Sequence, residues 1–423
     1  MNVLEESVGE LVDAPSRALK IVLSHPHGNP NSYHAARAFA EEDWLHRFQT
    51  GILGGSSTSR LFNLLPSGIK HRSAGRMPRG VPEAGRESHL LWEAVSRLGA
   101  RLKPGGLTRR VNWYDVLFWG HDLRVSQSLA SDLDAVYAYE DCARRTFAAA
   151  KKKSIATLYE LPLGYYRGVA EEINRARRNR SGLQPRAYAE PSWKQLRKDE
   201  ELRMADVVIV PCAWALDTLR LSDAGGAKRA IKIPYGTPAH EIAARTAPPG
   251  GPFTVLFAGQ VGLRKGVPHL VEAWEKLRLT DARLWLAGSL NLPKEYLRER
   301  SASFQYLGAL PRAELFERMR QADLLVFPSL AEGFGLVIGE AMASGVPVLT
   351  TTNTGGPELI TDGREGWCVQ AHCVDALAER LEWASRHRDR LFEMGNLARL
   401  RAEQWTWKDY RRKLTRELAP YLQ

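Results

Sequence analysis

Cysteine is scarce in this sequence, which has four among its 423 residues and no CxxC pair. Scattered cysteines argue against zinc-binding and disulfide frameworks, so we expect reduced thiols of the kind found in cytoplasmic proteins. Long hydrophobic runs are also absent, since no stretch approaches the ~18 apolar residues of a membrane span. The acidic start lacks the basic-then-apolar order of a secretory signal. Together these absences predict a cytoplasmic protein.

Acidic residues are fewer than basic residues, and the chain has a net charge of +11. The excess of basic residues is distributed unevenly along the chain. Residues 1–250 hold 36 Lys and Arg against 27 Asp and Glu, and residues 51–110 hold 11 against 3. A basic surface suits an anionic membrane, a phosphorylated acceptor or nucleic acid, and a merely solvated surface fits equally well. The basic runs contain no readable nucleic-acid motif, so we expect no nucleic-acid partner. A membrane partner would make the protein peripheral on the inner face of the membrane.

The most informative stretch is a strand, a glycine turn and a helix in succession. Asp323–Phe327 is an apolar run of the kind buried in a parallel sheet. Gly333 and Gly335 permit a tight turn with close backbone approach to a ligand. Leu336–Ala343 suits a helix, which Gly345 ends. Exposed N–H groups at the helix start and the positive end of its dipole predict an anion site.

Two carboxylates frame this turn, Glu332 before the helix and Glu340 inside it. If the helix starts near Gly335, Glu340 lies roughly 8 Å along its axis. One carboxylate can then accept hydroxyl hydrogen bonds on each side of a bound diphosphate. A sugar joined through a diphosphate to a ribose presents such hydroxyls. The alternative is a solvated Glu on a helix and another in a loop.

This segment resembles the donor-site signature of the retaining glycosyltransferases of family 4, also called group 1, in which two Glu are separated by seven residues. The flanking text agrees, with Thr354-Gly-Gly-Pro-Glu358 and Asp362-Gly-Arg-Glu-Gly366 after the helix. The resemblance is strong from Pro252 to Val369 and weak in the first half. It implies the GT-B fold, an α/β architecture of two doubly wound Rossmann-like domains with a cleft between them.

The implied reaction moves a sugar from a nucleoside-diphosphate sugar to an acceptor hydroxyl with retention of anomeric configuration. Polysaccharide, lipopolysaccharide or glycolipid synthesis is the implied setting, with a saccharide or lipid-linked acceptor. No Asp-x-Asp motif stands at a suitable strand end, so we expect no metal and no cofactor. A sugar-nucleotide-binding or scaffold protein without transferase activity is the alternative. A nucleotide-sugar epimerase of similar build matches the paired glutamates less well.

Ligands of open α/β sheets bind outside the carboxyl ends of the strands, which brings the loop after Ala258 beside the loop after Phe327. The first loop carries Arg264 and Lys265, which can meet a diphosphate. The family usually has an Arg directly after the first Gly, where this chain has Gln260. We expect Glu332, Arg264 and Lys265 to be catalytic. The resemblance implies donor contacts from Glu340, Gly333, Phe334, Gly335, Leu336, Gly259, Leu310 and Arg312.

The acceptor side departs from the family at three places. The first-strand loop has Gly28 where a glycine pair is usual, and His25 and His27 beside it are candidate acceptor contacts. Two strands that often end in His end here in Glu140-Asp141 and in Glu160. We expect Glu140 and Asp141 to bind the acceptor, and Glu160 to orient or polarise it. Alternatively, the two histidines lie at the surface, and Glu160 caps a turn or pairs with Arg144 or Arg167.

Strands and helices alternate in both halves, which favours two doubly wound domains. We expect an acceptor-binding domain over residues 1–245, a nucleotide-sugar-binding domain over 251–404, and a helix over 405–423 that crosses back to the first domain. Glu241–Pro252 is the natural linker. Residues 54–110 are rich in Gly, Pro, Ser and Arg, which predicts a long excursion with poor regular structure.

Overall fold

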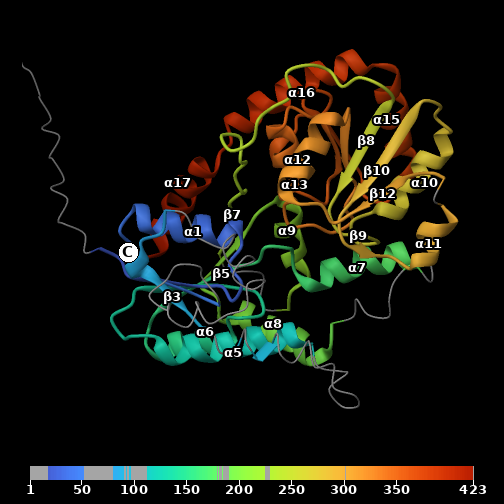
Figure 1. The fold of residues 1–423 in the computed structure, drawn as a ribbon. Coiled ribbons are helices and arrows are strands. Elements are labelled where there is room, and N and C mark those ends of the chain that lie inside the picture. Colours follow the sequence, from blue (N-terminus) through green and yellow to red (C-terminus); the bar gives the residue numbers. More distant parts are fainter. Residues whose placement is uncertain are drawn as a thin grey trace, which may run out of the picture.

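The computed structural model describes residues 18–51, 80–89, 92, 95–96, 112–178, 180, 183, 190–223, 229–300 and 302–422. Within these ranges the chain forms two large parallel sheets, each flanked by helices (Figure 1). This arrangement confirms the predicted α/β class with two doubly wound units. Most of the segment from Gly54 to Arg110 lies outside the described residues.

The first sheet has seven strands within the described residues, all paired in parallel. Their order is β3 (Arg86–Ser88), β2 (Leu45–Thr50), β1 (Ile21–Ser24), β4 (Ala135–Tyr139), β5 (Ala156–Glu160), β6 (Val207–Val210) and β7 (Ala230–Lys232). The accompanying helices are α1 (Pro30–Glu41), α5 (Trp113–Ser128), α6 (Arg144–Lys152), α7 (Tyr166–Arg178), α8 (Ser192–Met204) and α9 (Ala213–Thr218).

The edge strand β3 is a short regular element within residues 54–110, where the sequence predicts poor regular structure. Its three residues, Arg-Glu-Ser, pair in parallel with β2 although none of them is fully buried. A polar edge strand of this kind carries no hydrophobic alternation, so its sequence gives no periodic signal. The central strands β1, β4 and β6 are buried throughout, as a sheet covered on both faces requires.

The second sheet has six strands within the described residues, again all parallel. Their order is β12 (Gln305–Gly308), β10 (Ala282–Ala287), β8 (Phe253–Ala258), β13 (Leu324–Phe327), β14 (Val348–Thr351) and β15 (Gly366–Val369). Two short strands, β9 (Val261–Gly262) and β11 (Leu290–Asn291), pair separately. The helices are α10 (Val267–Leu277), α11 (Lys294–Glu299), α12 (Arg312–Gln321), α13 (Leu336–Ala343), α14 (Gly356–Leu359), α15 (Val374–Arg386) and α16 (Arg388–Glu403).

Each sheet reverses its strand order at one place, between β1 and β4 and between β8 and β13. Open α/β sheets bind ligands at such a switch point, outside the carboxyl ends of the strands. The loop after β8 carries Arg264 and Lys265, and the loop after β13 carries Glu332, all predicted donor-site residues. The second sheet therefore presents the predicted donor loops where a ligand is expected.

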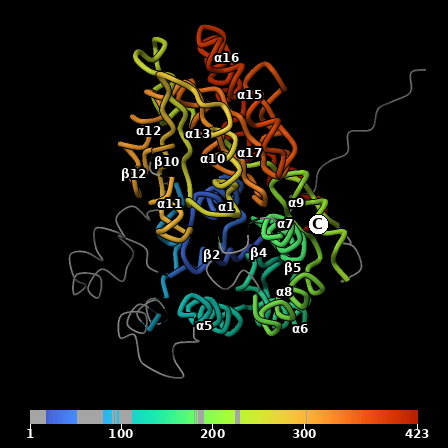
Figure 2. The backbone as a smooth tube through the Cα atoms, turned by 90° about the vertical axis from the view of Figure 1, so that its right-hand side faces the viewer, coloured from blue at the N-terminus to red at the C-terminus, as the bar shows by residue number. Residues whose placement is uncertain are grey.

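Contacts between the two halves include those made by α17 (Trp407–Leu418) and by α7. α17 packs against α1, where Arg411 Nε donates to Glu41 Oε2 at 2.7 Å and the rings of His34 and Trp407 stack at 4.1 Å. On another side, α7 lies between the second sheet's elements and α8 in both views (Figures 1 and 2). The expected domain boundaries at residues 245, 251 and 404 remain predictions.

Candidate active site between the two sheets

The glycine turn after β13 has a backbone that few other residues could adopt. Gly335 has a φ of +81°, and a Cβ on it would lie 2.8 Å from the Phe327 ring. α13 follows directly and spans Leu336–Ala343, as the sequence predicts. Gly333 lies against the other half of the molecule, since a Cβ there would stand 1.5 Å from the Pro162 carbonyl oxygen. The turn thus brings a helix N-terminus to the loops of the first sheet.

Glu332, Lys265 and Arg264 form one charged cluster beside this turn. Glu332 Oε2 pairs with Lys265 Nζ and lies 3.4 Å from Arg264 Nη1. Burial raises the pKa of Glu332, but the Lys265 ammonium and the Arg264 guanidinium outweigh burial and bring this pKa below its usual value. Burial lowers the pKa of Lys265. An ionised Glu332 therefore holds both predicted phosphate-binding cations in place, and the cluster keeps one positive charge in excess.

The loop that carries these two cations packs on the end of β13. It begins at Gly259 and ends at Gly266, where a Cβ would lie 1.9 Å from the Pro328 carbonyl oxygen. The Leu330 N–H donates to the Arg264 carbonyl at 2.8 Å. The carboxyl ends of β8 and β13 are therefore adjacent, as the switch-point rule requires. Backbone contacts this close leave room only for glycine at Gly266.

Glu340 faces different surroundings from Glu332. Its Oε1 lies 3.4 Å from Arg312 Nη2, and burial raises its pKa against the lowering by Arg312. Both side chains line a cavity of about 60 Å³ together with Leu336 and Trp407. Leu310 lies two residues before Arg312 and packs partly buried on the core. Glu332 is not part of this cavity's lining, so the two glutamates have different surroundings.

Glu160 lies at the end of β5, 1% exposed, among tyrosines. The Tyr137 hydroxyl donates to its Oε2 at 2.5 Å, and the Tyr235 hydroxyl donates to its Oε1. Burial raises the pKa of Glu160, while these hydrogen bonds oppose the rise. Neither arginine considered from the sequence is its partner, since Arg144 pairs with Glu200, and Arg167 with aspartates. Its part in acceptor binding or polarisation stays a prediction.

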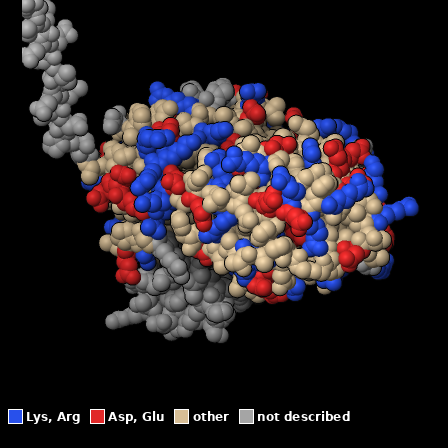
Figure 3. Space-filling view, turned by 90° about the horizontal axis from the view of Figure 1, so that it is seen from above, with Lys and Arg blue, Asp and Glu red and all other residues tan. Residues whose placement is uncertain are grey.

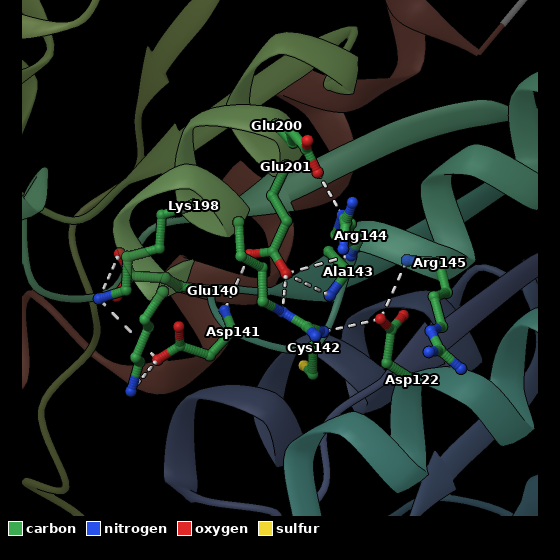
Figure 4. A network of polar contacts seen from close by, with 12 residues as sticks. Asp122, Glu140, Asp141, Cys142, Ala143, Arg144, Arg145, Lys198, Glu200 and Glu201 are labelled. Carbon is green, nitrogen blue, oxygen red and sulfur yellow. Dashed lines mark hydrogen bonds and ion pairs between the residues drawn. The ribbon is translucent and has the colours of Figure 1, made fainter. Parts of the chain in front are cut away.

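Glu140 and Asp141 are held by lysines of α8 (Figure 4). Lys198 Nζ lies 3.2 Å from Glu140 Oε1, and Lys194 Nζ lies 3.1 Å from Asp141 Oδ2. The Asp141 N–H donates to Glu201 Oε2 at 2.9 Å. Burial raises the pKa of Glu140 although Lys198 lowers it. The structure therefore places both carboxylates in an ion-pair network, and their contact with an acceptor stays a prediction.

The loop with His25, His27 and Gly28 is held by hydrogen bonds between its own residues. His25 Nδ1 accepts from the Gly28 N–H at 2.9 Å, and its Nε2 lies 3.2 Å from Asn29 Nδ2. Burial lowers the pKa of His25 to about 3, so the imidazole is neutral. The His27 ring packs edge-on against Phe118 of α5, with centroids 5.6 Å apart. The surface position considered for His25 is wrong, since its side chain is buried.

Two contacts between the halves were not predicted from the sequence. The buried Phe334 ring packs edge-on against Tyr235, with centroids 5.4 Å apart. Glu358 Oε1 accepts from the Ala213 N–H at 2.8 Å and lies 3.1 Å from Lys232 Nζ. Both contacts tie the second sheet to the first. Glu358 belongs to the Thr354–Glu358 motif that resembles the family's, so the motif marked this residue as a candidate. Its hydrogen-bond partner, Ala213, lies 145 residues away, so the contact itself could not be predicted from the sequence.

The described residues contain neither a cluster of metal ligands nor a membrane-spanning helix. No three His, Cys, Asp or Glu side chains in those ranges are grouped as metal ligands would be. None of the helices described is long and apolar enough to cross a membrane. Metal-independent transfer stays a prediction.

Comparison with known proteins gives matches for the second half by sequence and for nearly the whole chain by fold. The family described as "Glycosyl transferases group 1" matches residues 252–387. D-inositol 3-phosphate glycosyltransferase of Pseudarthrobacter chlorophenolicus is 35% identical over 168 residues, which are 37% of this chain and 40% of that protein. The chain thus matches about two fifths of the length of such curated relatives.

Solved structures of similar fold include HepE of Anabaena in complex with UDP and glucose, with a TM-score of 0.63 at 17% identity, covering 95% of this chain and 100% of that one. TarM of S. aureus has a TM-score of 0.65 at 12% identity, covering 96% and 99%. At such low identity these structures show the fold alone. The chain therefore has the GT-B fold, and residues 252–387 match the group 1 glycosyltransferase family.

Proposed function

We propose that this protein is a retaining glycosyltransferase that moves a sugar from a nucleoside-diphosphate sugar to an acceptor hydroxyl. The observation that carries this proposal is the cluster of Glu332, Lys265 and Arg264 at the glycine turn before α13. Two partly buried cations and a helix N-terminus at one switch point suit a diphosphate. HepE, which has this fold, is known in complex with UDP and glucose. A nucleotide-linked donor fits the same place here.

The second half supplies the donor site in this proposal. Lys265 and Arg264 bind the diphosphate and exchange part of their pairing with Glu332 for the phosphate oxygens. Glu332 is then free to accept hydrogen bonds from sugar hydroxyls. Glu340, in its own small cavity beside Arg312, takes the ribose hydroxyls. The backbone from Gly333 to Leu336 completes the phosphate contacts.

Catalysis rests on charge stabilisation. Negative charge grows on the leaving diphosphate, and preorganised cations and N–H dipoles stabilise it without reorganisation. The leaving phosphate accepts the acceptor's proton on the face from which it departs, which gives retention. Glu160 supports positive charge on the sugar ring or orients the acceptor. No metal is required in this proposal, since Lys265 and Arg264 supply the positive charge that a metal ion would otherwise provide.

The acceptor in this proposal is a saccharide, free or lipid-linked. The basic composition of residues 51–110 favours docking on the anionic inner face of a membrane. Sedimentation with anionic and neutral vesicles at two salt concentrations tests the docking. Equal binding to both vesicles would leave only a solvated surface.

The experiment that tests the function is product analysis with a labelled nucleotide sugar and a panel of saccharide acceptors. A new glycoside with the donor's anomeric configuration is the expected product. A protein that binds the donor but forms no product would be a sugar-nucleotide-binding scaffold. Isomerised donor without glycoside would identify an epimerase.

A further inference from the structure

Tyr235 lies in the segment that leads from β7 to the second half, and it is 3% exposed. Its hydroxyl donates to Glu160 Oε1 at the end of β5. Its carbonyl oxygen accepts from Trp405 Nε1 at 3.1 Å. Its ring packs against Trp407 and Tyr410 of α17, with centroids 6.1 and 5.7 Å apart. One buried residue between the halves therefore contacts both β5 and α17.

The same tyrosine ring also reaches the donor turn. Phe334 is 2% exposed and meets Tyr235 edge-on, with ring centroids 5.4 Å apart. Phe334 also packs on Gly355, where a Cβ would lie 2.3 Å from the Phe334 Cδ2, and its carbonyl oxygen accepts from the Gly355 N–H at 2.7 Å. The next residue, Gly335, caps the N-terminus of α13. The contact with Tyr235 therefore helps to fix the residue that leads into the anion-binding end of this helix.

The hydroxyl of Tyr235 acts on a carboxylate that is surrounded by tyrosines. The titratable groups that face Glu160 are Tyr137 and Tyr139 of β4, Tyr235 itself and Tyr410 of α17. A hydroxyl that donates to a carboxylate favours the charged form of that carboxylate. The hydrogen bonds from Tyr137 and Tyr235 therefore lower the pKa of Glu160 against the larger rise that burial causes. Removal of either hydroxyl should raise this pKa.

We propose that Tyr235 is a positioning residue for transfer, which aligns the donor turn through its ring and the Glu160 carboxylate through its hydroxyl. The inference rests on the proposed transferase function and adds a residue outside the predicted site. Tyr235 acts through Phe334 and Glu160, so it need not touch either substrate. Phenylalanine at this position keeps the ring and loses the hydroxyl, so the two contributions can be measured separately.

The first variant, Tyr235→Phe, tests the hydroxyl. Kinetics use the full chain with the donor and acceptor that product analysis identifies. We expect kcat to fall about tenfold while donor affinity stays within about twofold of the wild type, because only a hydrogen bond to Glu160 is lost. The raised pKa of Glu160 should move the acid limb of the kcat profile to higher pH. The same limb should be absent from Glu160→Gln.

The second variant, Tyr235→Leu, tests the ring. Calorimetric titration with UDP, GDP and ADP measures its affinity for each nucleotide that the wild type binds. We expect a loss of about tenfold, because Phe334 and the donor turn lose a packing partner, whereas Tyr235→Phe should bind as the wild type does. Tyr410→Phe is the matched control, since its hydroxyl lies in the same cluster but donates to no carboxylate among the described residues. It should keep the kcat profile and the affinity.

These measurements separate a positioning role from a structural one. If Tyr235→Phe keeps the kcat and the acid limb of the wild type, even with a lower Tm, the hydroxyl does not position Glu160 and the proposal is overturned. Wild-type nucleotide affinity in Tyr235→Leu overturns it as well. Should Tyr235→Leu not fold, the results for Tyr235→Phe decide. A wild type that binds none of the nucleotides and forms no glycoside contradicts the proposed function itself.

Discussion

At the scale of single residues, His269 shows what burial does to a titratable side chain. It is 1% exposed on α10, and neither ring nitrogen has a hydrogen-bond partner among the described residues. Burial, with smaller effects from Arg180 and His372, lowers its pKa to about 3. Below the usual value of 6.5 the unfolded chain takes up a proton that the folded chain does not, so this histidine makes folding less stable as pH falls from about 6.5 towards 3.

We predict that His269→Leu reduces the loss of stability on going from pH 7 to pH 5, by about 2 kcal/mol for this one group. Denaturant unfolding at the two pH values measures the loss. His240→Gln, a change at an exposed side chain, is the control. The same loss of stability in His269→Leu and wild type would show that His269 is charged in the folded protein.

Glu160 is the residue whose role is most open, because its carboxylate is buried among tyrosine hydroxyls. We predict that Glu160→Gln lowers kcat about ten- to hundredfold with normal donor affinity, since a charged hydrogen-bonding group contributes roughly 1.5–3 kcal/mol. Steady-state kinetics and donor calorimetry measure the two quantities, with Glu200→Gln at a solvated ion pair as control. Full turnover with an unaltered acceptor KM would remove Glu160 from the mechanism.

At the scale of elements, the glycine turn joins the two halves by direct backbone contact. A methyl group on Gly333 would overlap the Pro162 carbonyl oxygen. We predict that Gly333→Ala forces the turn and the loop before α7 apart and lowers kcat/KM at least tenfold, with a change in Tm of only a few degrees. Gly250→Ala, where a Cβ meets nothing within 4 Å, should leave activity unchanged. If Gly333→Ala is as active as the control variant, this contact has no part in transfer.

Elements whose ends are marked by nearby glycine residues could be predicted from the sequence. Elements defined by contacts with distant residues could not. Gly335 and Gly345 mark the ends of Leu336–Ala343, so that helix was predicted at its observed bounds. β3 lacks an apolar pattern, so it was missed. The ion pair of Glu140 with Lys198 joins residues 58 positions apart, and no local pattern reports it.

At the scale of the whole molecule, α7 joins the halves on one side of the cleft. Its Glu172 Oε2 lies 2.5 Å from His372 Nε2, and its Ala176 packs with Leu263 and Leu330 of the second half. The donor turn packs on this helix through Ala331, which contacts Val169 and Ile173. On the face over α16 and α17, Lys and Arg are interspersed with Asp and Glu (Figure 3). The excess of basic residues in 51–110 falls mostly outside the described residues. Only the composition of this segment can therefore be stated.

The measurement that tests the central claim most directly is calorimetric titration of nucleoside diphosphates into the wild type and Lys265→Ala. The account predicts that the wild type binds at least one diphosphate. Lys265→Ala should bind that diphosphate about ten- to hundredfold more weakly, because a hydrogen bond to a charged group contributes roughly 1.5–3 kcal/mol. Lys276→Ala, at an exposed ion pair on α10, is the matched control and should bind as the wild type does. Equal affinity in Lys265→Ala and wild type, or no binding by the wild type, would contradict a donor site at the glycine turn.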